Sequence, residues 1–309
     1  MRIVFLGTPP FAVPCLGALV GAGHEVLAVV CQPDRPAGRG GALRAPATKI
    51  WAGERGVRVL QPEKVRDGKL AAALEPLRPD ALVVAAYGRI LGADLLQLAP
   101  HGSINVHASL LPRYRGAAPI QWALAEGERE TGVTIMQMDE GLDSGDLLLQ
   151  RAIPIAPDDT GGTLHDKLAR LGGLALTEAL TLLAAGRIVP VKQDPARATQ
   201  APIIEKEHGR LDFSLPAHRL ALRVRAFDPW PGTFTSLAGR TLKVLAAVPD
   251  SAAGLSPGAV RAAAGGILVG CGQGTALLVT ELQLEGKRRL PAAEFLRGQA
   301  LPEGTVLGA

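Results

Sequence analysis

Two polar side chains close a short apolar segment of the sequence, and their spacing suits chemistry on a carbonyl group. Asn105 and His107 stand two residues apart at the end of the segment Ser103–His107. If this segment is a β-strand, its two-residue period puts both side chains on one face. Both could then donate a hydrogen bond to the same oxygen atom. A packing role for His107 is the alternative, since that is the commoner use of a histidine in a strand.

An acidic loop further along the chain adds carboxylates to this pair. The residues from Met138 to Asp146 include four acidic side chains and two glycines. A solvated turn is one interpretation of the loop, and a calcium-binding loop is another, although the distal bidentate glutamate of an EF-hand is missing. Taken together, Asn105, His107 and the acidic loop predict a polar site.

Motifs for several other chemistries are incomplete. The turn Gly7–Phe11 lacks the second and third glycines that let a backbone approach a pyrophosphate, which argues against a dinucleotide oxidoreductase. The glycines at 38–41 are not followed by the Lys-Ser/Thr pair of a phosphate-binding P-loop, so they predict a surface loop. Cys15, Cys31 and Cys271 form no CxxC motif, and we expect a reducing compartment with neither a disulfide framework nor a metal site.

The elements that must position the polar site alternate between strands and helices in the first half of the chain. Strands are expected at 3–6, 25–30, 57–60, 81–85, 103–107, 131–138 and 146–155, and helices at 10–21, 46–55, 62–77 and 163–185. Nearly continuous apolar strands separated by helices are typical of a parallel sheet that is covered on both faces. We therefore predict an α/β, Rossmann-like fold for this half.

The length of 309 residues predicts two domains. The segment 190–208 is polar and contains prolines at 190, 195 and 202, so we place a linker there, between a domain at 1–189 and one at 209–309. Beyond the linker, a basic amphipathic segment at 218–227 precedes short alternating stretches with glycine turns. This pattern predicts a smaller, β-rich, OB-like domain.

Charge and hydropathy bear on the partners of the chain. The formal charge of +4 lies entirely in residues 190–309, which hold 14 basic and 10 acidic residues. Such an excess fits a nucleic-acid partner, and it equally fits a solvated surface. No apolar run approaches the ~18 residues of a membrane-spanning helix, and the first residues lack the apolar stretch of a signal peptide. We therefore expect a cytoplasmic chain with no membrane partner.

Six segments carry a resemblance to a known family, and they span nearly the whole chain. They are Gln32–Gly40, Ala86–Gly88, Ile104–Gln121, Glu130–Met138, Asp139–Asp146 and Arg225–Gly232. In these segments the chain resembles the methionyl-tRNA formyltransferase family, within the superfamily of folate-dependent formyltransferases. One departure is Ala108, which stands where the family usually has glycine between the histidine and the serine. This change is mild if the local φ is negative.

The resemblance implies transfer of a formyl group from 10-formyltetrahydrofolate to the α-amino group of methionine on initiator tRNA, without a metal. It implies that Asn105, His107 and Asp143 form the catalytic set. Asn105 and protonated His107 would donate hydrogen bonds to the oxygen on which negative charge develops. Asp143 would keep His107 charged and help to remove the proton of the amine.

The resemblance also implies binding residues. For the folate we name the following set: Ser109, Leu110, Leu111, Pro112, Tyr87 and Leu91. Tyr87 and Leu91 are included because ligands bind at the carboxyl ends of strands in open α/β sheets. Core packing is the alternative for the leucines. The arginine-bearing loop 34–44, and Arg39 above all, would enter the acceptor end of the tRNA.

In the C-terminal domain, basic residues would contact phosphates nonspecifically. The candidates are Arg223, Arg225 and the cluster 287–289. We expect the chain to act as a monomer.

Two other functions stay open at this point. A sugar-nucleotide N-formyltransferase would share the Asn-x-His pair and the distal aspartate, but it would not need the loop 34–44 or a basic second domain. A tRNA-binding module without catalysis would be expected to lack Asn105, His107 or Asp143, and all three are present.

Overall fold

A computed structural model describes residues 1–37, 41–251 and 254–308, and the chain in it forms two compact units. The first unit comprises 1–119, 130–154 and 165–202, and the second comprises 120–129, 155–164 and the chain from 203 onward. Two short segments from before the predicted linker thus belong to the second unit. The domain boundaries at 189 and 209 stay a prediction.

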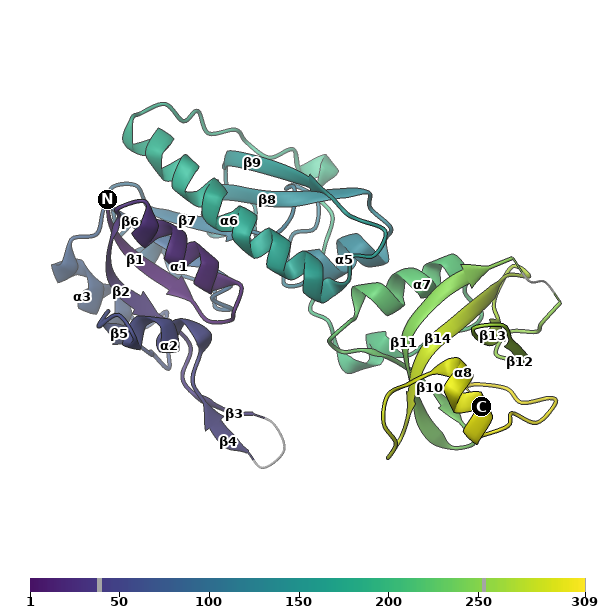
Figure 1. The fold of residues 1–309 in the computed structure, drawn as a ribbon. Coiled ribbons are helices and arrows are strands. Elements are labelled where there is room, and N and C mark those ends of the chain that lie inside the picture. Colours follow the sequence, from purple (N-terminus) through teal and green to yellow (C-terminus); the bar gives the residue numbers. More distant parts are fainter. Residues whose placement is uncertain (38–40, 252–253, 309) are drawn as a thin grey trace. The chain divides into compact units, whose positions relative to one another are not determined.

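The first unit is built on a seven-stranded mixed sheet (Figure 1). Its strands, in spatial order, are β5 (Val59–Leu60), β2 (Glu25–Val30), β1 (Arg2–Gly7), β6 (Ala81–Ala85), β7 (Ser103–His107), β8 (Glu130–Gln137) and β9 (Leu147–Pro154). The strands from β5 to β7 are parallel, whereas β8 and β9 are antiparallel to their neighbours. The predicted α/β, Rossmann-like class is confirmed, with an antiparallel pair at one edge.

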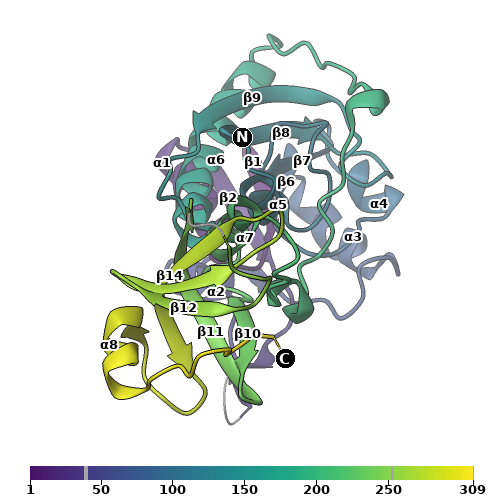
Figure 2. The same ribbon diagram turned by 90° about the vertical axis from the view of Figure 1, so that its right-hand side faces the viewer.

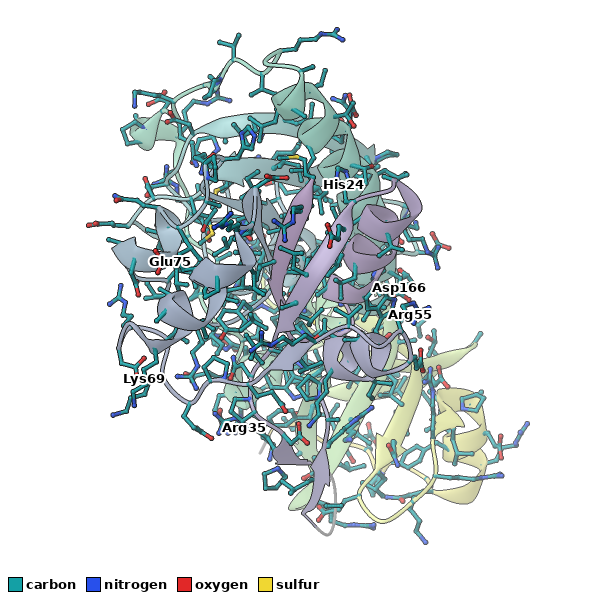
Figure 3. The ribbon with its side chains drawn as sticks, turned by 90° about the vertical axis from the view of Figure 1, so that its left-hand side faces the viewer. His24, Arg35, Arg55, Lys69, Glu75 and Asp166 are labelled. Carbon is teal, nitrogen blue, oxygen red and sulfur yellow. The ribbon has the colours of Figure 1, made fainter. Side chains whose placement is uncertain are left out.

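The helices expected at 10–21, 46–55, 62–77 and 163–185 are present with different bounds, and two further helices between residues 93 and 125 were not expected. They are α1 (Ala12–Gly21), α2 (Ala47–Gly53), α3 (Lys69–Leu74), the 3₁₀ turn η1 (Glu75–Leu77), α4 (Ala93–Leu96), α5 (Pro119–Ala125) and α6 (Gly161–Ala184). The predicted helix at 62–77 begins only at Lys69, because Gly68 before it has a left-handed φ of 77° that no helix continues through. The charged side chains of Lys69 and Glu75 lie on the outside of this unit (Figure 3).

Alternating side chains of the central strands build the core of the first unit. β1 and β6 pair so that Val4 lies beside Leu82 and Leu6 beside Val84, and all four belong to one buried cluster. The intervening residues of β1 are also completely buried, on the opposite face. Burial on both faces explains why these strands are apolar throughout.

A two-stranded hairpin occupies part of the segment that we expected to be an irregular surface loop. β3 (Arg35–Ala37) pairs antiparallel with β4 (Ala42–Arg44), and Arg35 faces Arg44 in the register. The hairpin extends from the first unit in Figure 1, and Arg35 is labelled on it in Figure 3. Arg39, the predicted tRNA contact, lies outside the described residues.

The second unit contains the predicted antiparallel, β-rich domain, seen most fully in Figure 2. Its strands are β10 (Thr233–Leu237), β11 (Arg240–Asp250), β14 (Ala276–Leu284), β13 (Gly266–Gly270) and β12 (Val260–Ala263), in that spatial order, with β15 (Leu290–Pro291) paired to β14. Its helical elements from residue 203 onward are η3 (Lys206–Gly209), α7 (Ala217–Ala226) and α8 (Ala292–Gly298).

Helix α7 covers this antiparallel sheet with one apolar face. Ala217, Leu220, Ala221 and Val224 recur at helical spacing and are buried, as the amphipathic pattern at 218–227 predicts. They join a cluster that includes residues of β11, β13 and β14. The second unit therefore has a hydrophobic core of its own. No helix in the described part of the chain combines the length and apolarity needed to cross a membrane.

Candidate active site

Strand β7 brings the first two predicted site residues to its carboxyl end, at the edge of the sheet where the parallel strands end. Its register pairs Asn105 with Val84 of β6 and His107 with Thr134 of β8. His107 is buried and Asn105 is half-buried. No hydrogen bond of the Asn105 side chain occurs to any residue that the structure describes, so its amide is open to a ligand.

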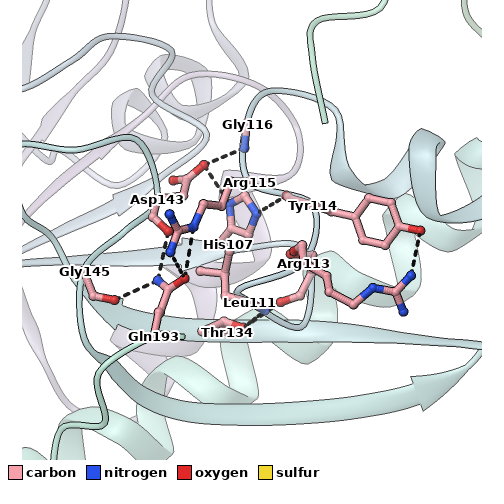
Figure 4. Close-up of polar contacts among 11 residues, drawn as sticks. His107, Leu111, Arg113, Tyr114, Arg115, Gly116, Thr134, Asp143, Gly145 and Gln193 are labelled. Carbon is pink, nitrogen blue, oxygen red and sulfur yellow. Dashed lines mark hydrogen bonds and ion pairs between the residues drawn. The ribbon is translucent and has the colours of Figure 1, made fainter. Parts of the chain in front are cut away.

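The imidazole of His107 lies between two acceptors (Figure 4). Its Nε2 is 2.9 Å from the main-chain oxygen of Tyr114, and Nδ1 is 3.6 Å from Oδ2 of Asp143. Because a carbonyl oxygen only accepts, Nε2 must be the donor in the first contact. The second distance is too long for a hydrogen bond. Nδ1 is therefore the ring atom that remains for a substrate oxygen or a water molecule.

The oxygen of Asp143 that faces His107 is also held by main chain. The carboxylate Oδ2 accepts a hydrogen bond of 2.8 Å from the N–H of Gly116. Gly116 has a φ of 122°, and a Cβ atom there would lie 2.6 Å from the oxygen of Ala201. Only glycine fits this position without a shift of the chain. Gly116 was missed by the sequence analysis as a site residue, although its place in the segment Ile104–Gln121 was a signal.

A segment that we predicted to be part of the linker supports two loops of the site, one carrying Asp143 and the other carrying Arg115. We call residues 191–201 the supporting segment. Val191 pairs with Leu147, and Gln193 donates from Nε2 to the main-chain oxygens of Asp143 (2.9 Å) and Gly145 (2.8 Å). The Oε1 atom of Gln193 accepts two hydrogen bonds from Arg115, of 3.1 and 2.7 Å. Nothing local in the sequence marks Gln193, because its partners are 48 to 78 positions away.

Left-handed backbone is concentrated at this edge of the sheet. Among the described non-glycine residues with positive φ are Ala86 (48°), Tyr114 (61°) and Asp143 (49°). Each costs roughly 1–2 kcal/mol relative to ordinary backbone. Such residues persist where the surrounding contacts determine the conformation, and they are common at functional sites.

The predicted folate segment divides into framework and surface. Ser109 is completely buried and donates from Oγ to the oxygen of Arg113 (2.7 Å). Leu111 is buried, and its main chain bonds to the side chains of Thr134 and Gln150. These contacts hold the loop against β8 and β9.

Leu110 and Pro112, which flank Leu111 in this segment, are half-buried. They keep surface that a ligand could touch. The side-chain hydroxyl of Ser109 and the side chain of Leu111 do not offer such a surface in this structure.

Tyr87 and Leu91 were expected to contact folate, but the structure places both side chains in the core. They are 2% and 3% exposed and belong to the cluster around β1 and β6. Burial raises the pKa of Tyr87 to about 12, and its hydroxyl has no hydrogen-bond partner among the described residues. The left-handed turn at Ala86 precedes Tyr87. Both residues lie in the chain after β6, and their contact with folate stays a prediction.

Two apolar side chains that we did not select are exposed on the loops beside the site. Ile90, after β6, is 63% exposed, and Leu142, next to Asp143, is 60% exposed. A large apolar residue next to a charged residue in a loop was the available signal in both cases. They offer apolar contact for a ring system near the polar set.

Basic residues in the second unit differ in what they contact. Nη1 of Arg225 donates to the main-chain oxygens of Ala156 and Asp159, so this guanidinium supports a turn of its own unit. Arg289 pairs with Glu281, and this contact lowers the pKa of the Glu281 carboxyl. The side chain of Arg288 is 78% exposed.

Neither thiol chemistry nor metal binding gains support from the described part of the chain. Cys15, Cys31 and Cys271 are buried, and burial raises the pKa of Cys15 to about 12 and that of Cys271 to about 11. Thiols with raised pKa values are poor nucleophiles. Within the described ranges no group of three or more His, Cys, Asp or Glu side chains could hold a metal ion.

Comparisons with known proteins agree over both units. The family model described as formyl transferase matches residues 1–180, and the one described as formyl transferase, C-terminal domain, matches residues 203–300. A solved structure of an N-formyltransferase from Helicobacter canadensis has a TM-score of 0.67 at 17% identity, over 90% of this chain and 98% of that one. This likeness shows the fold.

Curated relatives are much closer in sequence. Methionyl-tRNA formyltransferase of Anaeromyxobacter dehalogenans (strain 2CP-C) is 68% identical over 96% of this chain and 97% of its own length. Methionyl-tRNA formyltransferase of Geobacter sulfurreducens is 50% identical over 100% of this chain and 97% of its own length. The chain therefore belongs to the methionyl-tRNA formyltransferase family of formyl transferases.

Proposed function

We propose that this chain transfers the formyl group of 10-formyltetrahydrofolate to the α-amino group of methionine carried by initiator tRNA. The observation that carries the proposal is the arrangement of Asn105, His107 and Asp143 at one sheet edge, in a chain 68% identical to a methionyl-tRNA formyltransferase. The formyl-folate supplies a formamide-like carbonyl group, and the amine attacks its carbon. Negative charge then develops on the carbonyl oxygen.

The three side chains have distinct roles in this reaction. Asn105 donates from its open amide to the carbonyl oxygen, and His107 donates from Nδ1, since Nε2 is used by Tyr114. A well-placed donor of this kind stabilises the transition state by roughly 3–4 kcal/mol. Asp143 accepts the proton that the amine loses, directly or through water, and it faces the same Nδ1. The bond between the formyl carbon and the folate nitrogen then breaks, and this nitrogen takes up a proton from the same acid–base pair or from water, so that tetrahydrofolate leaves. Neither a metal nor a covalent intermediate is needed.

The surface around the polar set fits a flat, partly apolar donor. Ile90 and Leu142 are exposed on two loops, and Leu110 and Pro112 keep partial exposure on a third. We assign these four residues to the folate ring system. In the solved Helicobacter canadensis N-formyltransferase, the bound molecules are folinic acid and dTDP-3-aminofucose. That protein thus binds a formylated folate on the same fold.

The tRNA requires further surface. The hairpin β3–β4 carries Arg35 and Arg44 side by side in its register, and in the sequence Arg39 comes between its two strands. We assign this hairpin to the acceptor end and the basic second unit to nonspecific phosphate contacts. We propose that the chain works as a monomer, and we place it in the cytoplasm, where charged tRNA is used.

A labelling experiment tests the function directly. The purified chain is given formyl-labelled 10-formyltetrahydrofolate together with either initiator methionyl-tRNA or a nucleotide-linked amino sugar. We expect label on methionyl-tRNA only, and a much slower appearance of label when His107 is replaced by glutamine. Label on the amino sugar alone would identify a sugar-nucleotide N-formyltransferase. Tight tRNA binding without any transfer would identify a binding module.

A further inference from the structure

Two side chains of the supporting segment each hold a residue with left-handed backbone in the site. Gln193 donates to the main-chain oxygen of Asp143, whose φ is 49°. Thr199 accepts a hydrogen bond of 2.8 Å at Oγ1 from the N–H of Tyr114, whose φ is 61°. Tyr114 in turn accepts from the imidazole of His107. Each member of the histidine–aspartate pair is thus tied to the same segment.

We propose that Gln193 and Thr199 are positioning residues for formyl transfer, Gln193 acting on the carboxylate of Asp143 and Thr199 acting on the imidazole of His107. This inference rests on the proposed function and deepens it. The two family models match residues 1–180 and 203–300, so the supporting segment lies between them. Neither residue touches the reacting atoms, and both act through a neighbour.

The chemistry of a primary amide explains why glutamine suits this position. Nε2 carries two N–H donors and bonds to two carbonyl oxygens, of Asp143 and Gly145. Oε1 is an acceptor and receives both donors of Arg115. Glutamate has the same shape and would keep the contact with Arg115. It would, however, turn an unprotonated oxygen toward two carbonyl oxygens.

The loop that carries Asp143 is also fixed from its far side. A Cβ atom on Gly145 would lie only 1.7 Å from the oxygen of Gln137, at the end of β8. The loop is therefore pressed against the sheet at Gly145 and held by Gln193 at both Asp143 and Gly145. Loss of the Gln193 donors releases one of these restraints and leaves the other in place. A shift of the carboxylate relative to His107 is the expected result, with the fold retained.

Main-chain hydrogen bonds also join the supporting segment to the loop that carries Tyr114. The N–H of Arg115 donates to the oxygen of Thr199 (2.8 Å), and the N–H of Ala201 donates to the oxygen of Arg115 (2.7 Å). These two bonds do not depend on side chains. Replacing Thr199 with valine therefore removes only the contact with the N–H of Tyr114. It keeps the size of the side chain and the pairing of the segment.

The test measures kcat and KM for Gln193→Glu and Thr199→Val in the labelling assay. We expect kcat to fall by about tenfold or more in Gln193→Glu and by severalfold in Thr199→Val, because small displacements of reacting groups are costly. KM for formyl-folate and for tRNA should stay within about twofold, since binding surfaces are untouched. The matched control is Gln200→Glu, the same change at an exposed position of the same segment, and it should keep wild-type kcat.

A double variant separates positioning from a general structural role. If Gln193 acts through Asp143, adding Gln193→Glu to Asp143→Asn should lower kcat no further than Asp143→Asn alone. A fully multiplicative loss would overturn the proposal, and so would wild-type kcat in Gln193→Glu. If Gln193→Glu fails to fold, Thr199→Val combined with His107→Gln gives the same test. Absence of transfer by the wild-type chain would refute the proposed function instead.

Discussion

The two units of this protein hold their polar groups in different ways. In the first unit, the side chains of His107 and Asp143 are 7% and 14% exposed, and main-chain groups fix both of them. In the second unit, the side chains of Arg289 and Glu281 are 59% and 29% exposed, and they bond to each other. The first arrangement is set by the backbone, whereas the second is open to solvent.

This difference decides what each unit can contribute to a reaction. Donors and acceptors fixed by the backbone need no reorganisation when charge develops, and partial burial strengthens their effect. Exposed ion pairs contribute about 0–1 kcal/mol, and salt screens them. We therefore expect substitutions in the first unit to change turnover, and charge substitutions in the second to change salt-dependent binding.

Replacing His107 with glutamine should have the largest effect. The change removes the Nδ1 donor to the carbonyl oxygen and also the ring that Asp143 faces. We expect kcat to fall on the order of 10³-fold. Thermal unfolding should stay close to that of the wild-type chain. Single-turnover measurement with initiator methionyl-tRNA checks this, and a loss confined to KM would contradict the catalytic assignment.

Asp143→Asn should lower kcat by about 10²-fold, because an amide cannot take a proton from the amine. The amide oxygen can still accept from the N–H of Gly116, so the loop should keep its place. Steady-state kinetics at fixed pH measures the change. Turnover near the wild-type level would show that the proton leaves by another route.

Gly116→Ala should have an intermediate effect. The added Cβ would meet the oxygen of Ala201, and φ is 122°, so the chain must move and carry the N–H away from Asp143. We expect about a tenfold loss of kcat and about 1–3 kcal/mol of lost stability. The control is Gly186→Ala, where φ is 64° but no atom lies within 4 Å. It should lose some stability and no kcat; equal kcat in both variants would refute the argument.

The sequence predicted the parts of the molecule that depend on local pattern. Apolar runs located the strands of the seven-stranded sheet, and the two-residue period placed Asn105 and His107 on one face of β7. The supporting segment could not be found in this way. The sequence around Gln193 has no helix or strand period, and the hydrogen bonds of Gln193 join positions that are far apart in the chain. Local sequence position also failed to indicate that the side chain of Tyr87 is buried. Its position near a strand end suggested a ligand contact, but its ring packs into the core cluster of the first unit, which the local pattern did not indicate.

In the second unit, the double variant Lys287→Gln, Arg288→Gln should leave kcat unchanged. We expect KM for tRNA to rise severalfold at low salt and the difference to vanish at high salt, because phosphate contacts release counterions. Arg289 stays in place, so its pair with Glu281 is kept. Titration of KM against salt concentration measures the effect. A change of kcat would mean that this unit does more than bind.

The smallest effect is expected for Tyr87→Phe. This substitution tests whether the buried Tyr87 hydroxyl contributes to folate binding. The Tyr87 hydroxyl has no partner among the described residues, so its loss should change stability by about 0–1 kcal/mol in the favourable direction. KM for formyl-folate should not change, and an increase would restore the folate contact expected from the sequence.

The pH dependence of stability gives a second measurement on the same variant. Burial raises the pKa of Tyr87 from 10.0 to about 12 in the folded chain. The unfolded chain therefore loses this proton first, so the stability that Tyr87 contributes is complete below pH 10 and is lost as pH rises toward 12. Urea unfolding across this range should show a shallower loss of stability in Tyr87→Phe than in the wild-type chain. If the free energy of unfolding falls equally with pH in the two chains, the Tyr87 hydroxyl is accessible to solvent, and a ligand could then reach it as well.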